Sequence, residues 1–114
     1  MIKINSFNLD AEMVIGDTGS FSFTPKIDDK AFLQDGDTVY FTVRKLLDQT
    51  IIMQKTITEF EDGKCEIVIN PEDTMYLDEG NYIFDLKLVR GDGTVDSLIP
   101  NRPYAYFSLK KGVK

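Results

Sequence analysis

The chain has 114 residues, a formal net charge of −6 at pH 7, and 42% hydrophobic and 11% aromatic residues. A chain of this length suits one domain with a self-supporting core, and its hydrophobic content excludes the intrinsically disordered class. The acidic balance argues against nucleic acid and anionic membranes as partners, because both favour basic surfaces. We therefore expect a single domain over residues 1–114.

Short apolar runs alternate with polar residues and are separated by Gly and Asp turns, a pattern that predicts an all-β protein. The candidate strands cover residues 2–9, 20–27, 38–46, 50–60, 65–70, 81–89, 95–100 and 104–110. Strands of this length and spacing are typical of an antiparallel β-sandwich of about seven strands.

The strand predicted over residues 38–46 places Val39, Phe41 and Val43 on one face, which we expect to be buried. The earlier strand over residues 20–27 contains Pro25, which has no backbone N–H to donate. We expect that strand to lie at an edge of the sheet or to end near the proline.

Residues 50–60 have no single buried face, because Ile51 with Met53 competes against Ile52 for the core. This conflict of phase predicts a bulge or a bend within the strand. An Asp-Gly pair then follows in the sequence "EDGK", which suits a tight hairpin turn. We therefore expect this strand to pair with residues 65–70.

Cys65 is the only cysteine of the chain and shares a face of its predicted strand with Ile67 and Ile69. No intramolecular disulfide is possible, which suits a reducing compartment. A cysteine on an apolar strand face usually packs as a small hydrophobic residue, so we expect a core thiol here rather than a reactive one.

Residues 70–77 interrupt the β pattern and predict one short helical turn. Asn70 can cap a helix, Pro71 fits its first position, and acidic residues favour its positive end. Residues 81–89 follow, and their apolar side chains alternate with polar ones more regularly than in any other segment.

Asp78, Gly80, Tyr82 and Phe84 have the spacing of a tyrosine corner. In immunoglobulin-like sandwiches, a tyrosine near the start of strand F donates a hydrogen bond from its hydroxyl to the backbone a few residues upstream. Phe84 stands where a disulfide-bonded sandwich has cysteine, and it offers a large apolar filler instead. We therefore predict an immunoglobulin-like fold with this segment as its structural corner.

The sequence offers no catalytic residues, cofactor site or clear metal site. It contains no histidine, which removes the usual general base near neutral pH and most zinc sites. The adjacent acidic pairs Glu61–Asp62 and Glu72–Asp73 lie at a predicted hairpin and a predicted helical turn, where acids are favoured for local reasons. We therefore expect a protein that is not an enzyme.

Two short motifs have both a functional and a structural interpretation. Asp28, Asp29, Asp35 and Asp37 gather in one loop and could supply oxygen ligands to calcium, but their spacing matches no calcium-loop signature and Asp is also an ordinary turn residue. The sequence Arg-Gly-Asp at residues 90–92 spells an integrin-binding tripeptide, although a tight turn favours the same residues. The structural interpretation is preferred for both.

Arg102, Tyr104 and Tyr106 form the best candidate for a recognition surface. Tyrosine and arginine dominate the energetics of protein interfaces. If the residues between and after the two tyrosines face the core, both phenol rings lie on the opposite, outer face of the last strand.

Beyond these local motifs, residues 35–113 resemble a group of short immunoglobulin-like structural proteins of tailed bacteriophages and prophages. The group is similar to the N-terminal domains of phage baseplate upper proteins. The shared features are a Pro-Glu-Asp-Thr turn at Pro71 to Thr74, a Gly-x-Tyr strand entry at Gly80 and Tyr82, the acidic Asp85, an Asp-Gly hairpin at Asp92 and Gly93, a Leu-Ile-Pro exit at Leu98 to Pro100, and the earlier block "DGDTVYFTVRK".

The resemblance implies a virion component or tail-associated adaptor without catalytic residues. Its partners would be other virion proteins, with a homo-oligomer as a further possibility, and it would fold in the bacterial host cytoplasm before assembly into the virion. Two alternatives stay open: a carbohydrate-binding or surface-adhesion module, weakened by the absence of Trp, and a small acidic inhibitor of a host protein.

Overall fold

The protein is almost entirely β in its regular structure. The structure, a computed structural model, describes residues 2–4, 9–27, 30–31, 33–99 and 102–112. Its strands are β1 (Ile2–Ile4), β2 (Ala11–Val14), β3 (Gly19–Phe23), β4 (Lys26–Ile27), β5 (Lys30–Ala31), β6 (Thr38–Lys45), β7 (Ile51–Ile57), β8 (Cys65–Ile69), β9 (Gly80–Val89), β10 (Val95–Ser97) and β11 (Ala105–Lys110). One four-residue helix, α1 (Pro71–Thr74), lies between β8 and β9.

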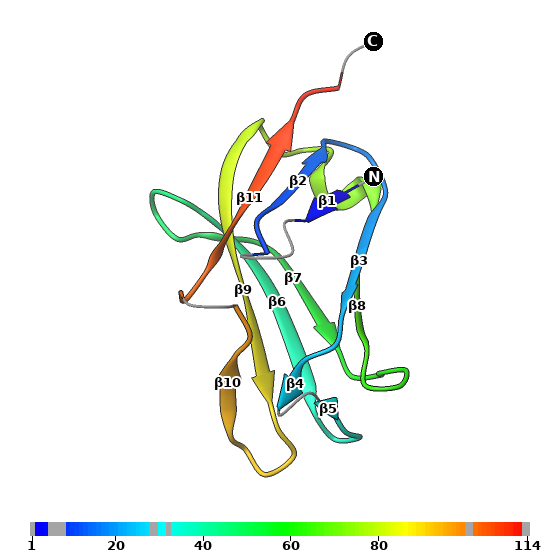
Figure 1. Cartoon of the computed structure of the whole chain (residues 1–114). Helices are drawn as coiled ribbons and strands as arrows, with labels where there is room; N and C mark the ends of the chain where they lie inside the picture. The colour runs from blue at the N-terminus through cyan, green and yellow to red at the C-terminus, as the bar shows by residue number, and fades with distance from the viewer. Residues whose placement is uncertain (1, 5–8, 28–29, 32, 100–101, 113–114) are drawn as a thin grey trace.

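The main sheet has the strand order β1-β2-β11-β9-β6-β7 (Figure 1). β10 pairs with the end of β9, on the same side of β9 as β11, which pairs with its beginning. Every pair in this sheet is antiparallel except β2 with β11, which run parallel. β9 is therefore the central strand, with β6 along one side and both β11 and β10 along the other.

A second layer consists of β3 and β8, which pair with each other and face the main sheet across the core (Figure 1). In β8, Cys65, Ile67 and Ile69 are fully buried, while the residues between them are exposed. Phe21 of β3 packs edge-on against Phe41 of β6 with 5.9 Å between ring centroids, which joins the two layers.

The core centres on three phenylalanines from neighbouring strands of the main sheet. Phe84 of β9 lies 5.2 Å from Phe41 of β6 and 6.3 Å from Phe107 of β11, measured between ring centroids. All three side chains are buried. The tilted and edge-on arrangements are those that aromatic rings favour over flat stacking.

The buried faces predicted from the alternation of residues are confirmed. Val39, Phe41 and Val43 have no exposed surface. β9 buries Tyr82, Phe84, Leu86 and Leu88, and β11 buries Ala105, Phe107 and Leu109. β3 ends at Phe23, two residues before Pro25, as the missing proline N–H leads one to expect.

The predicted bulge in the strand after residue 50 is also confirmed. The pairing of β6 with β7 steps from Val43 opposite Met53 to Arg44 opposite Ile51, so that Ile52 has no partner of its own. The extra residue lets Met53 turn into the core while Ile51 stays half exposed.

The predicted pairing of this strand with residues 65–70 is wrong. Glu61 and Lys64 do form a tight turn, with a positive φ at Asp62 and Gly63, but they make only an isolated bridge. β7 pairs with β6 in the main sheet, whereas β8 pairs with β3 in the opposite layer. The turn thus connects the two layers of the protein. Each of the two strands buries its apolar face from its own layer.

The strands predicted from the sequence were too few, and no parallel pairing was expected among them. β2 was not predicted, and its parallel pairing with β11 departs from the expected purely antiparallel sandwich. Its four residues are too few for a clear alternation to be read, and its position depends on a strand almost a hundred residues later. Part of the first predicted strand, residues 5–8, lies outside the described residues.

The predicted helical turn is present as α1. The carboxylate of Asp73 accepts a hydrogen bond of 2.7 Å from the backbone N–H of Asn70, as in one half of a capping box. Asp73 also forms an ion pair of 2.6 Å with Lys55 of β7. The buried hydroxyl oxygen of Thr74 accepts a hydrogen bond of 2.9 Å from Gly16, so α1 is tied to two other parts of the chain.

Replacing Phe84 with Ala should lower the free energy of unfolding by about 3–5 kcal/mol, because it opens a cavity between two buried rings. Chemical denaturation measures the change. Tyr76, which is 88% exposed, is the matched control, and its replacement with Ala should change stability by less than about 0.5 kcal/mol. A loss below about 1 kcal/mol for Phe84→Ala would contradict this description of the core.

Cys65 lies in the core as predicted, and burial raises the pKa of its thiol from 9.0 to about 12. The thiolate is the reactive form, so the native protein should resist alkylation at pH 9 and react fully once unfolded. As the pH rises, the thiol ionises in the unfolded chain before it ionises in the folded protein. The contribution of the buried, neutral thiol to the free energy of unfolding should therefore be complete below pH 9 and fall as the pH approaches 12. Mass spectrometry of iodoacetamide-treated protein, with and without denaturant, gives the measurement, and rapid native labelling would refute a buried thiol.

Candidate functional site

The residues predicted as an interface lie together beside β11. Arg102 and Tyr104 come just before that strand, and Tyr106 lies within it on the outer face of the main sheet, where 37% of it is exposed. The flanking Ala105 and Phe107 are buried, so the alternation of β11 directs Tyr106 outward. We refer to Asp10, Arg102, Tyr104 and Tyr106 as the Tyr-Arg cluster.

Asp10 holds this cluster together, and the sequence did not reveal its role. One of its carboxylate oxygens pairs with the guanidinium of Arg102 and also accepts a hydrogen bond of 2.9 Å from the backbone N–H of Tyr106. Asp10 precedes β2, which lies next to β11 only in the folded chain. A partner 92 residues away leaves no local signal in the sequence.

The side chains of Arg102, Tyr104 and Tyr106 pack against one another. The guanidinium carbon of Arg102 lies 5.5 Å from the ring centroid of Tyr106, within the range of a cation-π contact. Tyr104 packs edge-on against Tyr106 with 5.7 Å between centroids. A hydrogen bond with the Tyr104 side chain raises the pKa of the Tyr106 phenol.

A groove of about 550 Å³ lies beside Tyr106 on the outer face of the sheet. Its lining is mostly polar: Asp10, Glu12, Asn81 and Ser108 contribute alongside the tyrosine. The Ser108 hydroxyl lies 2.8 Å from the Asn81 amide oxygen, and Glu12 forms an ion pair of 2.8 Å with Lys110. These polar contacts connect the side chains that line the groove. Tyr106 adds an aromatic ring to the lining.

The predicted corner residues lie at the start of β9. The hydroxyl of Tyr82 donates a hydrogen bond of 2.7 Å to the backbone carbonyl of Asp78, and burial raises the pKa of this phenol. Gly80 has a φ of +149°, a conformation that other residues rarely adopt. Phe84, two residues after the tyrosine, reaches the aromatic centre of the core. All four residues therefore serve the scaffold.

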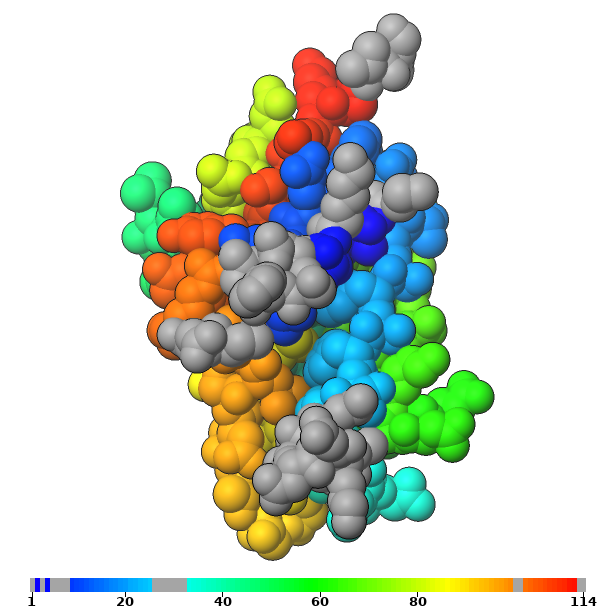
Figure 2. Space-filling view, in the orientation of Figure 1, coloured from blue at the N-terminus to red at the C-terminus, as the bar shows by residue number. Residues whose placement is uncertain are grey.

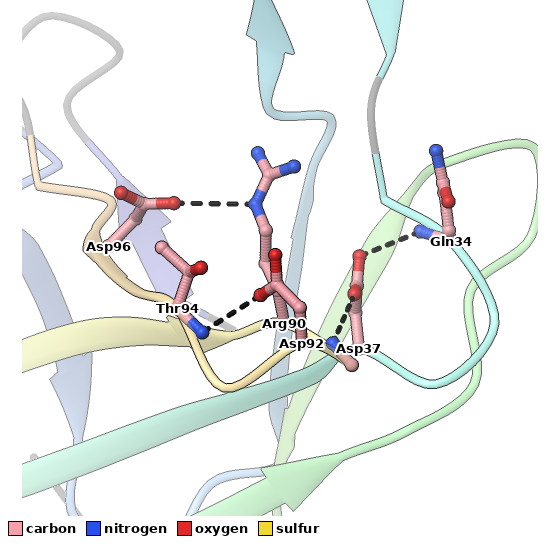
Figure 3. Close-up of polar contacts among 7 residues, drawn as sticks. Gln34, Asp37, Arg90, Asp92, Thr94 and Asp96 are labelled. Atoms are coloured by element: carbon pink, nitrogen blue, oxygen red, sulfur yellow. Dashed lines mark hydrogen bonds and ion pairs between the residues drawn. The ribbon is translucent and has the colours of Figure 1, made fainter.

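The Arg-Gly-Asp tripeptide lies at the tip of the β9–β10 hairpin, and its charged side chains contact the hairpin itself (Figure 3). The Asp92 carboxylate accepts a hydrogen bond of 2.9 Å from the Thr94 backbone, and Arg90 lies 3.4 Å from Asp96. Gly93 has a positive φ and donates to the Arg90 carbonyl at 2.8 Å. The tripeptide thus forms a closed turn.

Asp37 connects this hairpin to the loop that precedes β6 (Figure 3). Its carboxylate is buried and accepts hydrogen bonds from the backbone N–H of Gln34 at 2.9 Å and of Gly91 at 3.3 Å. Two of the other acids considered as calcium ligands, Asp28 and Asp29, lie outside the described residues. Within the described ranges, no three His, Cys, Asp or Glu side chains are grouped closely enough to hold a metal ion.

Comparison with protein-family models, curated proteins and solved structures finds no match to this chain. None of the described helices is long and apolar enough to cross a membrane.

Replacing Tyr82 with Phe should lower the free energy of unfolding by about 1 kcal/mol, because it removes one hydrogen bond and keeps the ring. Thermal or chemical denaturation measures the difference. Tyr76→Phe, at an exposed tyrosine just upstream, is the control and should leave stability unchanged. Equal stability of Tyr82→Phe and the parent protein would mean that the corner contributes nothing to the fold.

Proposed function

We propose that the chain is an immunoglobulin-like β-sandwich that acts as a non-enzymatic structural or adaptor protein of a tailed-phage or prophage particle. The strand arrangement supports the sandwich: β3 and β8 oppose a larger sheet, and β2 lies parallel to the last strand. The hydrogen bond of Tyr82 at the crossing from β8 to β9 is the feature expected of a tyrosine corner.

The observation that carries the proposed role is the Tyr-Arg cluster. Its residue types are those that contribute most to binding energy at protein interfaces. Asp10 and the ring contacts hold Arg102 and Tyr106 in place before a partner arrives. Binding therefore costs little side-chain entropy, which favours a specific contact over a merely solvated surface.

The resemblance to phage structural proteins rests on residues that shape the scaffold. The Pro-Glu-Asp-Thr sequence forms α1, Gly80 and Tyr82 begin β9, and Asp92 with Gly93 closes the next hairpin. Shared scaffold residues support a shared fold, while the surface residues set the partner. Other virion proteins are the proposed partners, met in the host cytoplasm during assembly and kept in the virion.

Several copies around a symmetric particle would strengthen a modest contact. When binding modules are linked in one assembly, each further contact forms at a high effective concentration. A surface as small as the Tyr-Arg cluster and its groove can then serve as a stable attachment point. No catalytic group is needed for such a role.

The test is binding of the purified protein to each product of the structural genes that neighbour its own. We expect one of them to bind, and Tyr106→Ala to weaken that binding at least tenfold, or about 1.4 kcal/mol. Arg102→Lys keeps the charge but loses the planar stack, so it should weaken binding less. Tyr76→Ala, at an exposed tyrosine outside the cluster, is the control.

Failure to bind any of these products would overturn the proposed role. Binding to a basic host protein that disappears with added salt would instead favour the acidic inhibitor, since exposed charges are screened within about 10 Å at 0.1 M salt. Specific retention on a glycan array would favour the carbohydrate-binding module.

A further inference from the structure

The β6–β7 hairpin carries apolar side chains into solvent. Leu47 at its tip is 97% exposed, Leu46 is 44% exposed, and Ile51 at the start of β7 is 52% exposed. The hairpin stands out from the body of the molecule at the left of Figures 1 and 2. Exposed apolar residues clustered on one projection usually mark a contact surface.

The hairpin tip is held rigidly by its own hydrogen bonds. Lys45 donates from its backbone N–H to the Thr50 carbonyl at 2.9 Å, and Gln49 donates to the Lys45 carbonyl at 3.1 Å. The Asp48 carboxylate accepts a third bond, of 3.0 Å, from the Thr50 backbone. These bonds define the backbone of the tip that displays the leucines.

A hollow of about 530 Å³ lies between this hairpin and the start of β9. Leu46 and Leu47 line one side, and Gly80 with Tyr82 lines the other. Gly80 has no side chain, and the space that a Cβ atom would enter holds no other atom within 4 Å. Asn81 and three charged residues complete the lining, so an apolar projection and a hollow of mixed apolar and polar character lie side by side on one surface.

We propose that this surface forms a twofold-symmetric dimer, in which Leu47 of each copy enters the hollow of the other. A twofold interface uses the same patch on both chains, so the patch must be complementary to itself. A projection next to a hollow meets this requirement. Two copies turned by 180° place each projection against the opposite hollow.

The charges around the hollow are complementary to themselves as well. Lys45 and the acidic Asp48 and Glu79 form part of its lining. In the twofold arrangement, the lysine of one copy faces the acids of the other. The same acids disfavour insertion of the leucines into an anionic membrane, and the net charge of −6 disfavours it further.

Sedimentation equilibrium of the complete chain over a range of concentrations tests the proposal. We expect a monomer-dimer equilibrium, and we expect Leu47→Ser to raise the dissociation constant at least about 100-fold, because the dimer buries two copies of this side chain. Leu47 is almost fully exposed, so the variant should fold normally, and circular dichroism checks this. Val95→Ser, at a 58% exposed site on β10, is the control and should leave the dimer intact.

A charge exchange tests the arrangement itself. Lys45→Glu should weaken the dimer, because each copy would then present three acidic side chains and no basic one to the other copy. Adding Glu79→Lys should restore the dimer. A protein that stays monomeric at every concentration, or a dimer that Leu47→Ser leaves unchanged, would overturn the proposal. So would Leu47-dependent binding to neutral lipid vesicles by a monomeric chain.

Discussion

The packing of Phe84 against Phe41 and Phe107 is the contact on which the rest of the structure depends. The three rings come from β9, β6 and β11, so one cluster joins the centre of the main sheet to both neighbouring strands. Phe21 of β3 meets the same cluster from the other layer. Burial of these large rings is a major favourable term in the folding of so small a domain.

Because β9 is held at its centre, both of its ends are set as well. Its start carries the Tyr82 hydrogen bond and one wall of the hollow beside the β6–β7 hairpin. Its other end leads into the turn that Asp37 fastens to the loop before β6. The same core also directs Tyr106 outward, since its neighbours Ala105 and Phe107 are buried. Both proposed contact surfaces therefore depend on strands that the aromatic core positions.

Three of the acidic residues order turns. Asp37, Asp48 and Asp92 each accept a hydrogen bond from a backbone N–H of their own turn, and Asp37 accepts a second one from Gly91 of the neighbouring hairpin. The pKa of the Asp48 carboxyl is lowered chiefly by the backbone hydrogen bond from Thr50, and the pKa of the Asp92 carboxyl by hydrogen bonds from the side chain and backbone of Thr94. Asp37 of the acidic loop and Asp92 of the Arg-Gly-Asp tripeptide thus have local structural roles, whereas Asp28 and Asp29 lie outside the described residues.

The sequence by itself determined the buried faces of β6, β8, β9 and β11 and several local features of the chain. Strand alternation, the proline that follows β3, the phase conflict before Met53, the α1 turn and the spacing of Tyr82 from Asp78 all reflect contacts between near neighbours. Such contacts follow from local stereochemistry and therefore leave a local pattern.

Only the tertiary structure decided which strands pair. It placed β7 and β8 in different layers, β2 parallel to β11, and Asp10 in an ion pair with Arg102. The backbone hydrogen bonds of a strand are nearly the same with any partner, so local sequence does not select among them. The selection comes from how all the apolar faces fit into one core, and that is a property of the whole chain.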